Sequence, residues 1–86
     1  MEKYNVVLKK SAAKELEAIP QNDIQKIIKR IQDLASNPRP ANSQKLTNSG
    51  HYRIRQGNYR IVYLILDNSK TVEIYKIGHR REVYRS

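Results

Sequence analysis

Arginine is the residue type in this chain whose number and spacing best suit chemistry. Arg53, Arg55 and Arg60 lie close together, and Arg80 and Arg81 follow near the C-terminal end. A guanidinium group donates two hydrogen bonds to a phosphate at once and stays charged in proteins. The cluster therefore predicts a surface that binds phosphate groups or RNA.

The charge balance also indicates an anionic partner. The 86 residues include 17 Lys and Arg against 8 Asp and Glu, which gives a net charge of +9. Residues 44–86 hold nine of the basic groups and three of the acidic ones, and six of those nine are arginine. A basic surface that serves only solubility does not require arginine to be concentrated in one half of the chain.

Several other kinds of chemistry lack the residues they need. Without cysteine there is no disulfide, thiolate metal site or cysteine nucleophile, and two isolated histidines do not predict a metal site. We expect no metal and no cofactor. The longest apolar run, residues 61–66, is far shorter than the ~20 residues of a membrane span, and no secretion signal is evident. We therefore expect a cytoplasmic protein that makes no membrane contact.

The N-terminal half predicts one strand and two helices. Tyr4, Val6 and Leu8 stand at alternate positions of residues 4–8, as apolar residues do along one face of a strand. The first helix is predicted to be capped by Ser11 and to end near Ile19. The second is predicted to be capped by Asn22, with an apolar stripe that reaches Ala35. The two helices are expected to form a hairpin.

The hydrophobic period changes from 3.6 to 2 in the C-terminal half. Residues 36–49 are predicted to be a polar loop, and strands are predicted at 51–56, 59–67 and 70–77. The predicted fold class is α+β, as a single domain over residues 1–86. It consists of an N-terminal strand, a two-helix hairpin and a three-stranded antiparallel meander, with the helices packed on one face of the sheet.

Turn chemistry predicts how these strands pair. Gly57-Asn58 is typical of a two-residue hairpin turn, which would pair Arg55 with Arg60 and Arg53 with Val62. Cross-strand partners share a face of the sheet. The three arginines then lie on one face, and the other face is apolar, with Tyr52, Ile54, Tyr59, Ile61, Tyr63, Ile65, Val72 and Ile74.

A second two-residue turn is predicted at Asn68-Ser69. It would pair Tyr63 with Ile74, Val62 with Tyr75, and Arg60 with Ile77. In this register Tyr75 joins the arginine face, where an aromatic ring beside basic groups suits a single nucleic-acid strand. Val62 and Leu64 are also expected on that face, as apolar surface for a partner.

These segments resemble the RelE/ParE superfamily of toxins from type II toxin–antitoxin modules. The resemblance rests on YRIR, GNYRIVY and IGHRREVY at residues 52–55, 57–63 and 77–84. It is closer to the RelE branch than to the ParE branch. That branch implies an mRNA interferase, a metal-independent endoribonuclease that acts in the ribosomal A site. There the RNA 2′-hydroxyl attacks the adjacent phosphodiester.

The resemblance implies a role for each site residue. Arg60 would hold the phosphate, Arg80 would stabilise or protonate the leaving oxygen, and Tyr84 would position the base or help to activate the 2′-hydroxyl. Arg53, Arg55 and Arg81 would bind RNA or phosphate. Because arginine stays protonated, Arg53 and Arg55 are expected to orient the substrate and stabilise charge, and to be poor general bases.

The resemblance also implies partners and leaves alternatives open. The partners would be a cognate antitoxin with an acidic segment that wraps the toxin, the ribosome, and mRNA. One alternative is a ParE-like inhibitor of DNA gyrase on the same fold. Another is a basic RNA-binding module without catalysis. Some ribosome-dependent relatives use a Glu–His pair, for which His79 is a candidate without an evident glutamate.

Overall fold

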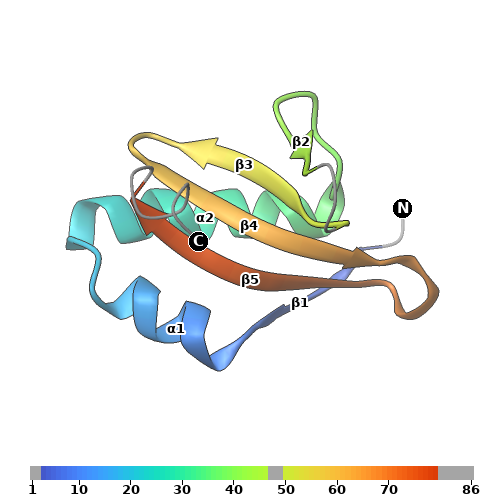
Figure 1. The fold of residues 1–86 in the computed structure, drawn as a ribbon, viewed down its shortest axis with the longest axis horizontal. Coiled ribbons are helices and arrows are strands. Elements are labelled where there is room, and N and C mark those ends of the chain that lie inside the picture. The colour runs from blue at the N-terminus through green and yellow to red at the C-terminus, as the bar shows by residue number, and fades with distance from the viewer. Residues whose placement is uncertain (1–2, 47–49, 80–86) are drawn as a thin grey trace.

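The structure is a computed structural model that describes residues 3–46 and 50–79. Figure 1 shows its helices and strands in the order in which the chain forms them. They are β1 (Asn5–Leu8), α1 (Lys10–Glu17), α2 (Gln21–Ser36), β2 (Gln44–Lys45), β3 (Tyr52–Gln56), β4 (Tyr59–Leu66), the 3-10 turn η1 (Asp67–Ser69) and β5 (Thr71–His79). No helix in the described part of the chain is long and apolar enough to span a membrane.

The strands form one mixed sheet in the order β1-β5-β4-β3-β2. β1 pairs with β5 in parallel, and the remaining neighbours are antiparallel. Helix α1 packs against β5, while α2 lies behind the sheet in Figure 1 and packs against β1 and β3. The predicted α+β class, with a strand, two helices and a meander, is confirmed. The prediction of a loop throughout 36–49 is wrong, because β2 pairs with β3 there.

Both helices begin two residues earlier than predicted, so the predicted caps at Ser11 and Asn22 are wrong. The cap positions are Lys9 and Pro20, and neither makes a side-chain capping bond. The backbone carbonyl of Pro20 accepts from the N–H groups of the first turn of α2. Proline suits this position because its fixed φ matches the approach to a helix and it has no N–H to satisfy.

The core lies between the two helices and the inner face of the sheet. The predicted apolar face is confirmed: Ile54, Ile61 and Tyr63 are fully buried, and Tyr52, Tyr59 and Ile65 pack against them. The helices add Ala12, Ile19, Ile27, Ile31 and Leu34. The hydroxyl of the buried Tyr63 donates a hydrogen bond of 2.8 Å to the carbonyl of Pro38, and burial raises the pKa of this phenol.

The β4–β5 connection differs from the predicted two-residue turn. Leu66 pairs with Thr71, so four residues, including η1, make the turn. The predicted pair of Tyr63 with Ile74 is confirmed, but a β-bulge follows it and shifts the register by one residue. The predicted pairs of Val62 with Tyr75 and of Arg60 with Ile77 are therefore wrong. The observed partners are Lys76 for Val62, Ile77 for Ile61 and Gly78 for Arg60.

The β-bulge allows the side chain of Ile77 to be buried in the core. Without it, strict alternation would leave Ile77 on the face opposite the core, beside the arginines. One extra residue returns the side chain to the core, where it is 1% exposed. Tyr75 is that extra residue, and its ring centroid lies 4.6 Å from that of His51.

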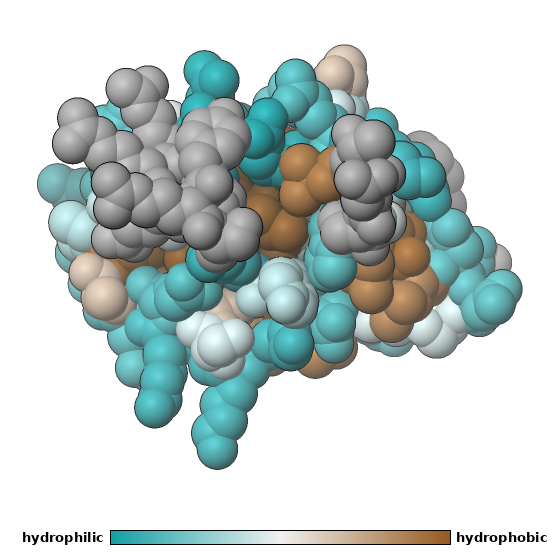
Figure 2. Space-filling view, in the orientation of Figure 1, coloured by the Kyte–Doolittle hydropathy of each residue, from teal (hydrophilic) through white to brown (hydrophobic). Residues whose placement is uncertain are grey.

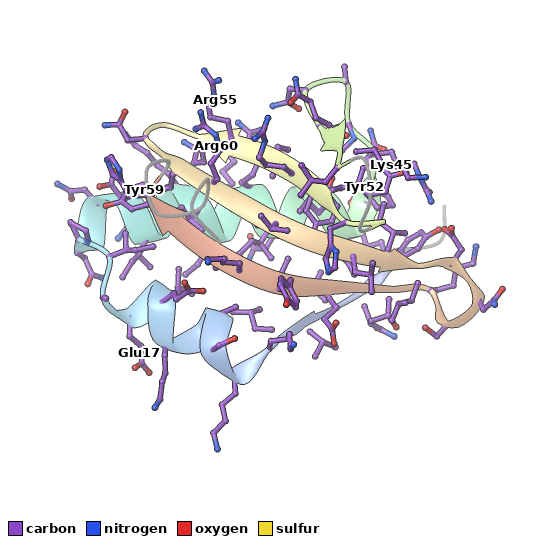
Figure 3. All side chains as sticks on the ribbon, viewed as in Figure 1. Glu17, Lys45, Tyr52, Arg55, Tyr59 and Arg60 are labelled. Atoms are coloured by element: carbon purple, nitrogen blue, oxygen red, sulfur yellow. The ribbon has the colours of Figure 1, made fainter. Side chains whose placement is uncertain are left out.

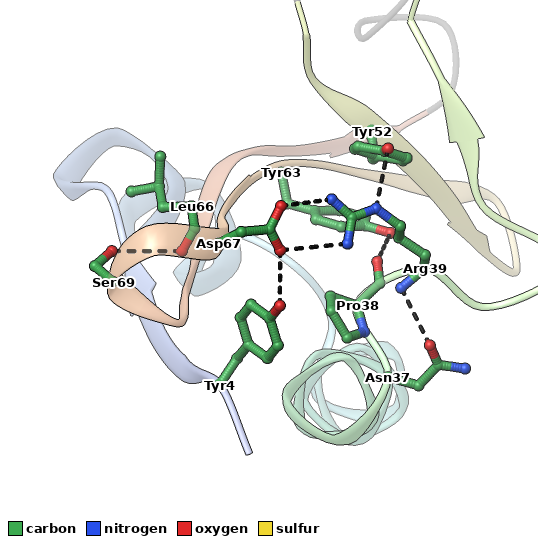
Figure 4. A network of polar contacts seen from close by, with 9 residues as sticks. All are labelled: Tyr4, Asn37, Pro38, Arg39, Tyr52, Tyr63, Leu66, Asp67 and Ser69. Carbon is green, nitrogen blue, oxygen red and sulfur yellow. Dashed lines mark hydrogen bonds and ion pairs between the residues drawn. The ribbon is translucent and has the colours of Figure 1, made fainter. Parts of the chain in front are cut away.

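A polar network connects several segments at the end of the sheet where β4 ends and η1 begins (Figure 4). The guanidinium of Arg39 donates to the Asp67 carboxylate, with the shorter contact at 2.9 Å, and to the Tyr52 hydroxyl at 3.2 Å. The hydroxyl of Tyr4 donates to the same carboxylate at 2.7 Å. The network joins the segments before β1, after α2 and after β4. The hydrogen bond from Arg39 holds the pKa of Asp67 below its usual value of 3.8.

We expect Asp67→Asn to lower the midpoint temperature of unfolding slightly at pH 7. The Arg39 and Asp67 side chains are 46% and 53% exposed, so water weakens their attraction. Because the pKa of Asp67 is lower in the folded protein, its ionised carboxylate contributes its full stability at pH values above about 3.8. This contribution is lost as the pH falls through the lower pKa that Asp67 has in the folded protein. Thermal unfolding at neutral and acidic pH measures this. The difference between wild type and variant should shrink in acid, and equal midpoints at pH 7 would contradict the role of Asp67.

Candidate functional site

Three of the candidate site residues lie on the β3–β4 hairpin. The predicted register is confirmed in full: Arg55 pairs with Arg60, and Arg53 pairs with Val62. Gly57 has a φ of +60°, a conformation that glycine adopts without strain and that the first position of a type II′ hairpin turn requires. The turn therefore holds Arg55 and Arg60 directly opposite each other. Figure 3 shows both side chains near the hairpin end.

The two opposed arginines differ in burial. Arg55 is exposed, whereas Arg60 is only 3% exposed and is the one buried charged residue among the described positions. The pairing rule places Arg60 on the outer face but does not predict its burial. A buried guanidinium beside a like charge is costly unless an anion or hydrogen-bond acceptors offset it. Burial opposite another cation makes Arg60 a candidate site residue.

A cavity of about 490 Å³ opens at this hairpin. Its described lining has four arginines and no carboxylate. The arginines are Arg30, Arg53, Arg55 and Arg60, and the other lining residues are Asn42, Gln44, Gln56 and Gly57. The sequence pattern brings three of these arginines together but misses the fourth. Arg30 comes from α2, off its apolar stripe. Only the packing of α2 against β3 brings it to the cavity, so no local signal identifies it.

Neutral amides orient two of these arginines. The Nη2 group of Arg53 donates to the Gln44 Oε1 atom at 2.6 Å, and the Nε group of Arg30 donates to the Gln56 Oε1 atom at 3.1 Å. An amide oxygen fixes the direction of a guanidinium but carries no charge to neutralise it. These two hydrogen bonds orient guanidinium groups in a lining that has no carboxylate among the described residues. Such a preformed array of cations suits a phosphate and the negative charge that develops during phosphoryl chemistry.

A second, smaller cavity lies at the end of β5. It has a volume of about 250 Å³, and its lining includes Glu15, Tyr59 and His79. The rings of Tyr59 and His79 meet edge to face at 5.8 Å, and the Glu15 carboxylate accepts a hydrogen bond from the backbone N–H of Ile77 at 3.2 Å. Glu15 of α1 therefore lines the same cavity as His79, although it lies 64 positions earlier in the chain.

The remaining predicted site residues lie outside the described part of the chain. These are Arg80, Arg81 and Tyr84. The described strand β5 ends at His79, one residue after Gly78, the partner of Arg60. The role of each in the site stays a prediction from sequence.

The outer face of the sheet offers less apolar surface than expected. Val62 was predicted to be available to a partner, but it is 6% exposed, and Leu64 is partly buried. Tyr75 and Leu66 are more exposed, at 41% and 40%. Figure 2 shows apolar atoms between hydrophilic side chains on the face turned to the viewer, which is the face opposite α2.

The sequence and the fold both have counterparts among known proteins. The model of the family described as "ParE toxin of type II toxin-antitoxin system, parDE" matches residues 6–84. The RelE1 protein of Methanocaldococcus jannaschii is 31% identical over 98% of both chains. This chain therefore belongs to the ParE toxin family of type II toxin–antitoxin systems, within the RelE/ParE superfamily.

Solved structures are similar over nearly the whole chain. The toxin–antitoxin complex RelBE2 from Mycobacterium tuberculosis contains a chain with a TM-score of 0.84 and 28% identity, covering 93% of this chain and 94% of that one. The RelE–RelB complex from Pyrococcus horikoshii contains one with a TM-score of 0.82 and 27% identity, covering 91% and 96%. The likeness spans the sheet and both helices, which is the framework that positions the cavity.

We expect Arg55→Gln to make the folded protein more stable and its binding of phosphate weaker. Like charges directly opposite each other destabilise a sheet, and an opposed pair is worth roughly 0.2–1 kcal/mol. Added inorganic phosphate should raise the unfolding midpoint of the wild type more than that of the variant, because a ligand stabilises the state that binds it. Thermal unfolding across a phosphate series at constant ionic strength measures both effects.

Lys10→Gln is the matched control for this experiment. It removes one positive charge from the exposed surface of α1, away from the cavity. The control should respond to phosphate as the wild type does. If Arg55→Gln also keeps the full response, the arginine cavity is not the phosphate site.

Proposed function

We propose that this toxin is a ribosome-dependent endoribonuclease that cuts mRNA in the A site. The observation that carries the proposal is the hairpin cavity, in which four arginines converge with no carboxylate in the described lining. A phosphodiester is the biological anion that this array fits best, because guanidinium groups bind its two non-bridging oxygens in parallel.

In this mechanism the RNA 2′-hydroxyl attacks the adjacent phosphorus. A bond forms between the 2′-oxygen and phosphorus, and the bond from phosphorus to the 5′-oxygen breaks. The 2′-hydroxyl gives up its proton and the leaving 5′-oxygen takes one up, so the products are a 2′,3′-cyclic phosphate and a 5′-hydroxyl. Arg60, fixed in the buried floor of the cavity, holds the phosphate, while Arg53 and Arg55 orient the strand and stabilise the developing charge.

The C-terminal residues 80–86 supply the remaining groups in our proposal. Arg80 stabilises or protonates the leaving 5′-oxygen, Tyr84 positions the base or helps to activate the 2′-hydroxyl, and Arg81 adds a phosphate contact. None of the described arginines acts as a general base, because arginine stays protonated. The enzyme therefore relies on the ribosome to align the RNA, and we expect weak or no cleavage of free RNA.

We further propose that a cognate antitoxin neutralises this chain. Two of the solved relatives are complexes of a toxin with its antitoxin. A net charge of +9 favours a partner segment that is acidic, which would bind rapidly and could cover the arginine cavity. The exposed Tyr75 and Leu66 provide apolar anchors for such a segment.

Inhibition of DNA gyrase is the second candidate function. The observation that favours it is the matching family model, which is that of the ParE toxin. A gyrase inhibitor acts by binding and has no need of a phosphate cavity. A basic RNA-binding module without catalysis would use the cavity but would leave RNA intact.

We expect the purified toxin to cut mRNA within A-site codons in a reconstituted translation reaction. Primer extension maps the new 5′ ends, and a reaction without ribosomes should show almost none. Arg60→Ala and Arg80→Ala should each lower the rate of cutting by about 10²–10³-fold, as the loss of one preorganised charge-stabilising group does.

The alternatives predict other results for the same reaction. Lys14→Ala, a charge removed from α1, is the matched control and should cut at the wild-type rate. Intact mRNA together with inhibited supercoiling by gyrase would overturn the nuclease proposal in favour of the gyrase function. Salt-sensitive RNA binding without cuts would establish the module that binds without catalysis.

A further inference from the structure

A third cavity continues the arginine cavity onto helix α2. It has a volume of about 230 Å³, and its described lining is Lys26, Lys29, Arg30, Asp33 and Gln56. Arg30 and Gln56 line both cavities. The two therefore meet at the hydrogen bond between the Nε group of Arg30 and the Gln56 amide oxygen.

The sheet leaves this route open. Strand β2 pairs only with Tyr52 and Arg53, so within the described residues no strand covers the outer edge of β3 from Ile54 to Gln56. A groove can therefore pass from the arginine face, over the edge of β3, to the polar side of α2. Figure 1 shows β2 at one end of β3 and the hairpin turn at the other.

The lining of the joined cavities fits a nucleic acid better than a peptide. Among the described residues it contains six cationic side chains and one carboxylate, and no large apolar side chain. Protein interfaces have apolar, often aromatic, centres, whereas interfaces with nucleic acids are more polar and far more positive. An acidic peptide would pair with these cationic side chains, but the described lining offers no apolar surface on which an anchor side chain could pack.

We infer that the RNA strand whose phosphate occupies the arginine cavity continues over the edge of β3 and along α2. This inference rests on the proposed function and adds the course of the flanking RNA. Arg30 is the residue at the crossing, and the Gln56 amide orients it without neutralising its charge. Lys26 and Lys29 bind the phosphates that follow, and Asp33 sets a repulsive boundary beside them.

The length and salt dependence of RNA binding tests the inference. We would use 2′-O-methyl oligonucleotides, which lack the attacking hydroxyl, so that binding is measured without cleavage. Lengths of about 4 and about 16 nucleotides bracket the site sizes of single-strand-binding folds. For the long strand, Lys26→Ala/Lys29→Ala should reduce the slope of log K against log salt by about 1.4, since each phosphate contact contributes about 0.7. For the short strand the slope should stay unchanged.

Two further variants make the test specific. Lys10→Ala/Lys14→Ala removes the same charge from α1 and should leave both slopes at their wild-type values. Gln56→Glu keeps a hydrogen-bond partner for Arg30, but the new carboxylate neutralises the charge of Arg30. This variant should therefore weaken binding of the long strand with little effect on the unfolding midpoint. Equal slope changes in the α1 and α2 double variants would overturn the inference, because they would reflect net charge alone. Binding of an acidic peptide, but not RNA, through Lys26 and Lys29 would also overturn it.

Failure here is distinguishable from failure of the proposed function. Cuts in the translation reaction with unchanged slopes in the α2 variants would refute the RNA course along α2 and leave the nuclease intact. Slopes that change as expected, with no cuts in translation, would refute the nuclease and establish the RNA path.

Discussion

The pairing of β3 with β4 across Gly57 is the constraint on which the rest of the structure depends. One register places Ile54 opposite Ile61 in the core and Arg55 opposite Arg60 on the outer face. Because side chains alternate along a strand, a slip of one residue would expose the isoleucines and carry arginines toward the helices. The apolar face therefore protects the geometry of the cationic one, and the burial that stabilises the fold also holds the opposed arginines together.

Neutral amide side chains orient two of the arginines that line the cationic cavity. A carboxylate in the place of either glutamine would compete with an anionic ligand for Arg30 or Arg53. Gln56 and Gln44 instead supply neutral oxygens at these two positions. The ion pair of Arg39 with Asp67 lies in a different network, which fastens the termini of strands rather than the cavity. The ion pair that stabilises the fold is thus separate from the arginines that line the cavity.

The end of β5 depends on contacts far away in sequence. β1 ends at Leu8, opposite Ile74, so β5 extends beyond its parallel neighbour. Glu15 of α1 then accepts the hydrogen bond from the Ile77 N–H, on the side where β1 no longer pairs. The β-bulge in the same stretch turns Ile77 into the core and brings Gly78 opposite Arg60. Together, the helix and the bulge fix the described end of β5, with Gly78 opposite Arg60.

Local patterns in the sequence determined the fold class, the β3–β4 register and the face that carries Arg53, Arg55 and Arg60. Those features follow from a two-residue turn and strict alternation, which act between neighbours along the chain. Tertiary structure alone decided the β-bulge at Tyr75, the burial of Arg60 and the formation of strand β2. It also decided that Arg30 and Glu15 line their cavities. Each depends on which side chains meet when the helices pack on the sheet, and residues separated by tens of positions leave no periodic signal of that meeting.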